Sequence, residues 1–195
     1  MAGLMASSAS LTTLAKINLK RQPVAVAFLP VPPPGLERIG HAAAELESLV
    51  ATMIQLRYLR SEEIPKLPHR QQPMQVAAYA PLDRATFAAD IVIFRGNSRQ
   101  IMLLSEAARA AGVSEAAAAM GRPAGAMIPH AIDSASAVAS LGCIGNRVYT
   151  ELGDDELYLT VPGSALTATL NQLETILTAN SELEKFHRQR AASLS

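Results

Sequence analysis

One pattern recurs along the second half of the chain: an apolar run ends near a glycine, polar or basic residues follow, and a helix-forming stretch begins. The apolar runs are 91–94, 116–120 and 137–141, and the glycines that follow them are Gly96, Gly121 and Gly142. Short apolar runs indicate buried strands, and glycine permits a sharp turn into the next element. Strands that alternate with helices predict an α/β fold, which we expect to be a mixed sheet with helices packed on it.

The rest of the chain supplies further strands and helices. We expect strands at 24–29, 76–80 and 156–161, and helices at 10–19, 41–60, 98–111, 124–134, 143–152 and 164–190. The last of these is a long C-terminal helix with an apolar stripe made of Leu166, Leu170, Leu173, Ile176 and Leu177. A chain of 195 residues can bury one substantial core. We therefore expect one domain over 1–195, with an ordered core from 10 to 195.

Charge and cysteine content narrow the classes of function. Lys plus Arg and Asp plus Glu both number 17, so no overall field attracts nucleic acid or an anionic membrane. No apolar run is long enough for a membrane helix, and no export signal precedes the first helix. The single cysteine excludes an internal disulfide framework and an all-cysteine metal site. We expect a cytoplasmic protein without nucleic-acid or membrane partners.

Cys143, the only cysteine, is the best candidate for chemistry. It follows Gly142 and precedes Gly145, at the point where the third apolar run passes into a helix. The unpaired N–H groups of a helix start favour negative charge and so stabilise a thiolate. The alternative is that Cys143 is a small buried apolar residue, because unpaired cysteines are often buried.

The three strand-to-helix turns also carry arginines. Ligands of open α/β sheets bind beyond the carboxyl ends of strands, where helix N-termini offer backbone donors. We expect the turns to converge on an anion-binding pocket, in which arginines bind carboxylate or phosphate and glycines allow close approach. The alternative is that the arginines are solvated or pair with nearby carboxylates. The candidate ligand-binding residues are Gly96, Asn97, Arg99, Gly121, Arg122, Gly142, Gly145, Asn146 and Arg147, and Arg95 is a further possible donor.

Two other groups of polar residues are given ordinary structural assignments. Asp154, Asp155 and Glu156 directly precede a strand, so we interpret them as a solvated turn. His130 is interpreted as a core or surface histidine, and His187, among charged residues, is predicted to face water. The chain contains no Walker loop, no Gly-x-Ser-x-Gly elbow, no His-Glu-x-x-His and no Gly-x-Gly-x-x-Gly after a strand.

Several stretches of the sequence resemble a known family. They are Gln22–Val26, Ala78–Leu82, Asp90–Ile93, Gly96–Met102, Gly121–Pro123, Ser140–Thr150, Asp155–Tyr158 and Pro162–Gly163. In these the chain is similar to the uncharacterised bacterial and archaeal proteins known as the domain of unknown function 169 family. The resemblance implies an α/β fold and ranks Cys143, Arg147 and Arg122 among the family-like positions, but it implies no reaction.

The chain departs from that family at two places. Many relatives have a cysteine-bearing segment with Phe-Trp and Asp-His where this chain passes from Gly35 to Gly40 and His41. Relatives often have a second cysteine after the Arg-Pro pair, where this chain has Ala124 and Gly125. These departures argue against metal or disulfide chemistry that needs several thiols.

Three hypotheses for function follow. The leading one is a protein that binds a small anionic molecule or an organic cofactor around Cys143, the identity of the cofactor being unknown. The second is a redox enzyme that uses Cys143 as a nucleophile, as a redox thiol or as a single thiolate ligand to haem or another metal cofactor, or that depends on a flavin. The third is a homo-oligomeric interaction protein in which the stripe from Leu166 to Leu177 packs on a second copy.

Overall fold

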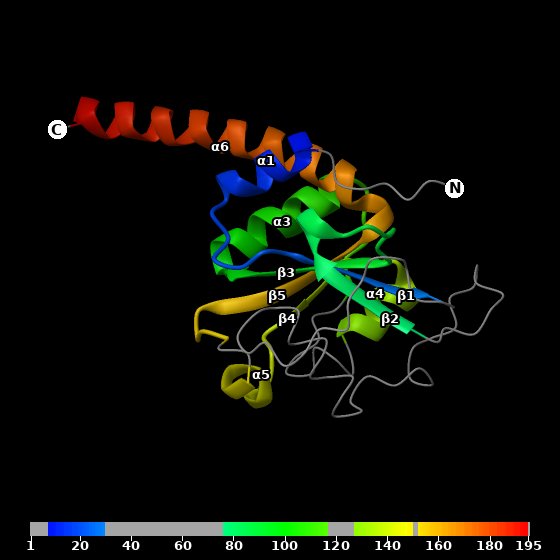
Figure 1. The fold of residues 1–195 in the computed structure, drawn as a ribbon. Helices are drawn as coiled ribbons and strands as arrows, with labels where there is room; N and C mark the ends of the chain where they lie inside the picture. Colours follow the sequence, from blue (N-terminus) through cyan, green and yellow to red (C-terminus); the bar gives the residue numbers. More distant parts are fainter. Residues whose placement is uncertain (1–7, 30–75, 117–126, 150–151, 195) are drawn as a thin grey trace.

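Five strands form one sheet in the order β2-β1-β3-β5-β4 in the computed structural model, which describes residues 8–29, 76–116, 127–149 and 152–194 (Figure 1). The strands are β1 (Val24–Leu29), β2 (Val76–Pro81), β3 (Ile91–Asn97), β4 (Val138–Ser140) and β5 (Glu156–Pro162). All five coincide closely with apolar runs of the sequence. The predicted helix at 41–60, the predicted strand at 116–120 and the turn at 121–123 lie wholly or mostly outside the described residues.

Neighbouring strands of this sheet pair in an antiparallel manner. One isolated parallel bridge, between Glu115 and Ala137, lies next to β4. The helices are α1 (Ser8–Lys16), α3 (Ser98–Ala110), α4 (Ile128–Ser134), α5 (Ile144–Tyr149) and α6 (Leu166–Leu194), with short 3-10 turns η1 (Leu82–Arg84) and η3 (Gly163–Ala165). The predicted α/β class, with helices on a sheet and a long C-terminal helix, is confirmed.

Both faces of the sheet are covered, and successive side chains of each strand point to opposite faces. One face, with Ala25, Ala27, Val92 and Phe94, packs under α1, α3 and α6. The other face packs against α4 and the segment around Leu152, through Val24, Val26, Phe28, Ile91, Ile93, Val138 and Tyr158. Figure 1 shows α1, α3 and α6 on one side of the sheet and α4 and α5 on the other. Side chains that leave opposite faces of one strand therefore enter different layers.

The C-terminal helix α6 has two parts. Leu166, Leu170 and Leu173 are buried in the chain's own core, and Ile176 and Leu177 pack partly against it. Every residue from 181 to 193 is exposed, and this part of α6 extends past the rest of the fold (Figure 1). The stripe expected to pack on a second copy thus stabilises the chain itself.

The register brings two strand ends to one edge of the sheet. Asn97 at the end of β3 pairs with Glu156 at the start of β5, and Ser140 at the end of β4 pairs with Tyr158 of β5. Since both β3 and β4 are antiparallel to β5, they run in the same direction with β5 between them. Their carboxyl ends, and the turns that follow, flank the start of β5.

Candidate functional site

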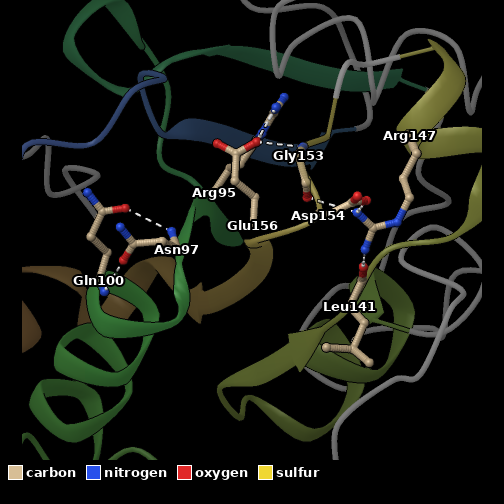
Figure 2. A network of polar contacts seen from close by, with 8 residues as sticks. All are labelled: Arg95, Asn97, Gln100, Leu141, Arg147, Gly153, Asp154 and Glu156. Atoms are coloured by element: carbon tan, nitrogen blue, oxygen red, sulfur yellow. Dashed lines mark hydrogen bonds and ion pairs between the residues drawn. The ribbon is translucent and has the colours of Figure 1, made fainter.

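A buried ion pair lies at this edge of the sheet. Arg95 of β3 and Glu156 of β5 have side chains that are only 3% and 5% exposed. Arg95 donates from Nη2 and Nε to Glu156 Oε2, at 2.5 and 3.0 Å, and the N–H of Gly153 donates to the same oxygen at 2.8 Å (Figure 2). Removing two charges from water is unfavourable unless they are paired and hydrogen-bonded, as they are here.

The surroundings of Glu156 set its ionisation. Burial alone raises the pKa of this carboxyl, but the hydrogen bonds from Arg95 and Gly153, with the positive charges of Arg95 and Lys20, hold the pKa below its ordinary value. Glu156 is therefore a buried carboxylate that stays ionised. The interpretation of Glu156 as part of a solvated turn was wrong, because its place at the start of β5 points its side chain into the sheet face that holds Arg95.

The loop before β5 connects this ion pair to Arg147 of α5. Arg147 Nη1 donates to the carbonyl of Gly153 at 2.8 Å and to Asp154 Oδ1 at 3.1 Å. Its Nη2 donates to the carbonyl of Leu141 at 3.2 Å (Figure 2). Gly153 thus donates its N–H to Glu156 and accepts from Arg147, so the peptide chain of this loop links the two arginines.

Arg147 keeps capacity for a ligand. Three N–H groups of its guanidinium make the contacts above, and among the described residues its Nε–H and one Nη2 N–H have no partner. The side chain is 32% exposed, and its only carboxylate partner in the described part of the chain, Asp154, is fully exposed. An exposed ion pair is weak, so an incoming anion can compete with Asp154.

Cys143 lies at the turn from β4 into α5 and is half-buried. Asn146, one turn later and buried, accepts the N–H of Cys143 at 3.0 Å and its thiol at 3.1 Å through the same Oδ1. Asn146 thereby holds the thiol over the first turn of α5. The structure places Cys143 outside the two core clusters, and its reactivity stays a prediction.

Cys143 and Arg147 lie on one face of this turn. They are four residues apart, and the N–H of Arg147 donates to the carbonyl of Cys143 at 3.2 Å. Two apolar residues with the same spacing, Ile144 and Val148, are 84% and 67% exposed, and Leu141 is also exposed. A thiol, a guanidinium and solvent-exposed apolar side chains therefore occupy one short segment.

Two of the predicted ligand-binding glycines have structural roles. Gly142 has φ of +75°, and a Cβ there would lie 2.3 Å from Leu152 Cδ2. A Cβ on Gly96 would meet Gln100 Oε1 at 2.8 Å. Both glycines are buried, so they allow the chain to pack on itself and do not open the backbone to a ligand. Gly145 is half-buried within α5.

The predicted residues at the start of α3 also serve the fold. Asn97 caps α3 by accepting the N–H of Gln100, and Gln100 Oε1 accepts the N–H of Asn97, which is a capping box (Figure 2). Gln100 also donates to the carbonyls of Ile17 and Asn18, which fixes the end of α1. Arg99 is exposed and lies 3.6 Å from Glu184 of α6, in the helix layer on the far side of the sheet from α4.

The structure therefore brings together only part of the predicted pocket. Cys143, Asn146 and Arg147 lie together, whereas Arg99 points into another layer and Arg95 is occupied by Glu156. Gly121 and Arg122 lie outside the described residues. His130 and His187 are exposed, as predicted for His187. The sequence signal for the buried pair was Arg95 itself, since a charge that ends a buried apolar run requires a buried partner.

Three further findings concern metals, membranes and acid–base groups. Within residues 8–29, 76–116, 127–149 and 152–194, no three His, Cys, Asp or Glu side chains cluster so as to hold a metal ion. No helix in those ranges is long and apolar enough to cross a membrane. Among the acid–base groups of the described residues, Asp154 forms an ion pair with Arg147 at 3.1 Å.

Comparison with known protein families gives a match over most of the chain. The model of the domain of unknown function 169 family, described as "Uncharacterised ArCR", matches residues 37–172, which is more than half of the chain. The matched range includes β3, β4, β5 and the turn at Cys143. No curated protein and no solved structure matches the sequence.

Proposed function

The chain belongs to the domain of unknown function 169 family, and from that premise we propose that it binds a small anionic molecule or an organic cofactor at the turn between β4 and α5. The family assigns no reaction, so the proposal depends on the residues of this turn. The observation that carries it is the pairing of Cys143 and Arg147 on one face of a single helical turn, with both side chains partly accessible.

The chemistry of the turn favours a ligand with an anionic end and an apolar body. Arg147 offers two remaining N–H donors and can exchange its exposed partner Asp154 for a carboxylate or phosphate. Ile144 and Val148 offer apolar surface beside it. Exposed apolar side chains in such a cluster are typical of binding surfaces. Catalysis is not required by this arrangement.

The buried pair supports the turn without touching the ligand. Glu156 holds the N–H of Gly153, and the carbonyl of Gly153 in turn accepts from Arg147. A site is effective when the residues behind it fix the geometry of the groups that bind. We therefore expect Arg95 and Glu156 to position Arg147 from the interior.

Native mass spectrometry of the freshly purified chain tests this proposal. We expect a bound species that is lost in Arg147→Ala and retained in Arg109→Ala, a matched control because Arg109 is an exposed arginine paired with Glu106 on α3. Arg147→Ala also removes hydrogen bonds to backbone carbonyls, so a second variant is needed that leaves these bonds in place. The double variant Ile144→Ser/Val148→Ser removes only exposed apolar groups. We expect it to lose the bound species while its melting temperature stays unchanged. A wild-type chain without any bound species would refute the proposal. Retention of the bound species in both Arg147→Ala and Ile144→Ser/Val148→Ser would also refute it.

A redox enzyme is the second candidate, and the half-buried thiol of Cys143 favours it. A thiol outside the core can act as a nucleophile or as an axial ligand that sets the electronics of a cofactor. The visible absorption spectrum separates the candidates, since a haem or flavin band that Cys143→Ser shifts or abolishes supports the enzyme. A colourless preparation argues against the form of this enzyme that depends on haem or flavin.

We also propose that the protein acts in the cytoplasm, without nucleic-acid or membrane partners. The single cysteine fits a reducing compartment, and the equal numbers of acidic and basic residues provide no field for a polyanion. Fractionation of cells that express the tagged chain checks the location, and recovery in the membrane fraction would contradict it.

A further inference from the structure

The second half of α6 is exposed to solvent, and it is tied to α3 by the ion pair between Arg99 and Glu184. Residues 181–193 are all exposed and form about 20 Å of helix at 1.5 Å per residue, which continues past the start of α3 (Figure 1). Most of the stability of helices in proteins comes from packing of one face against another surface. A partner that covers this segment would stabilise it.

The exposed segment carries large apolar side chains. Leu183 and Phe186, three residues apart, are neighbours on the helix surface and are each 55% exposed. Together these two side chains form a small apolar patch on the part of α6 that continues past Glu184, which Arg99 of α3 contacts at 3.6 Å.

The charges on the same face are arranged with opposite signs around Phe186. Glu182 lies four residues before Phe186 and Arg190 four residues after it, so the three side chains share one face of the helix. Glu182 contacts Lys185 at 2.6 Å within the helix, and among the described residues Arg190 has no carboxylate partner. This face is acidic on one side of Phe186 and basic on the other.

We infer that this face binds the same face of a second copy of the chain, with the two α6 segments antiparallel and Phe186 near the two-fold axis. In that arrangement Glu182 of each copy lies opposite Arg190 of the other, and Leu183 and Phe186 cover one another. A parallel arrangement would place Glu182 against Glu182 and Arg190 against Arg190, which is unfavourable. A self-complementary patch is what a two-fold interface requires. The inference is independent of the site at Cys143.

Sedimentation velocity of the full chain over a concentration series tests this pairing. We expect a monomer–dimer equilibrium for the wild type and a monomer for Phe186→Asp, with circular dichroism showing that the fold is kept. Glu182→Arg should raise the dimer dissociation constant about tenfold, because two symmetric ion pairs become repulsive contacts. The double variant Glu182→Arg/Arg190→Glu restores the charge pairing and should return to within about threefold of wild type.

Glu106→Arg is the matched control, since Glu106 is an exposed glutamate on α3 that pairs with Arg109. It should leave the dissociation constant unchanged. The inference is overturned if the wild type is a monomer throughout the series, if Phe186→Asp and Glu182→Arg leave the dimer intact, or if Glu106→Arg weakens it as much as Glu182→Arg. A double variant as weak as Glu182→Arg alone would overturn the antiparallel arrangement.

Discussion

Replacing one partner of the Arg95–Glu156 pair should destabilise the fold strongly. Both side chains are at most 5% exposed, so Arg95→Met leaves a buried carboxylate without its cation, and Glu156→Gln leaves a buried guanidinium without its anion. Breaking a buried pair in this way costs about 3–5 kcal/mol. Since small domains unfold with a total free energy of about 5–15 kcal/mol, this is a large share of the stability.

The double variant Arg95→Met/Glu156→Leu removes both charges and should behave differently. Substitution of a whole buried ion pair by apolar residues of similar volume is often neutral or stabilising by about 1–4 kcal/mol. We therefore expect the double variant to be more stable than either single variant. Urea unfolding followed by circular dichroism is the suitable assay, because the chain has no tryptophan. With a slope of about 2 kcal/mol per M, each single variant lowers the midpoint by about 1.5–2.5 M.

The pH dependence provides a second test with a defined sign. In the wild type the pKa of Glu156 is lower in the folded state than in the unfolded state. Its contribution to the free energy of unfolding is therefore present above the pKa of the unfolded state and is lost as pH falls through the pKa of the folded state. In Arg95→Met, burial without the cation raises the pKa of Glu156, so the penalty is full at neutral pH and shrinks as pH falls through that raised pKa. The difference in unfolding free energy between wild type and Arg95→Met should therefore narrow as the solution is acidified.

Two results would refute this reasoning. Single variants that each cost less than about 1 kcal/mol would match an exposed ion pair and would contradict burial of this one. A difference between wild type and Arg95→Met that is constant from pH 7 to acid would show that Glu156 does not titrate against Arg95.

The remaining predictions concern the turns and the thiol. An alanine in a left-handed conformation costs about 1–2 kcal/mol of unfolding free energy, and Gly112→Ala, with φ of +82° and open space around it, should cost only that amount. Gly142→Ala should cost more, because its Cβ would also meet the side chain of Leu152. Equal losses in the two variants would contradict the contact with Leu152. Asn97→Ala should cost about 1 kcal/mol in thermal unfolding through loss of the α3 cap, and no loss would contradict the capping role. Cys143, being half-buried, should react with iodoacetamide in the native protein, and protection until unfolding would assign it to the core.

Much of the fold was predictable from the sequence because it depends on local pattern. The apolar runs that became β1, β3 and β5 and the stripe that anchors α6 follow from alternation and from helical spacing. The placement of Cys143 at the turn into a short helix followed from the glycines beside it. The resemblance of several sequence stretches to the domain of unknown function 169 family is confirmed by the match over residues 37–172.

The candidate site was less predictable, because the arginines that we expected to converge on it follow different strands. Arg95, Arg99 and Arg147 looked alike in sequence, as arginines near strand ends. Arg95 became a buried partner of Glu156, Arg99 entered the layer of α6, and Arg147 remained accessible. Which face a side chain leaves and which strand lies next to it decide such outcomes, and neither is encoded locally.

The sequence by itself determined where strands and helices form, since these depend on the spacing of apolar residues and on the backbone freedom of glycine and proline. Tertiary structure decided the order β2-β1-β3-β5-β4 and with it the neighbours of each charge. The physical reason is that pairing between distant strands sets which polar groups leave water together, and a buried charge is stable only where its partner is buried with it.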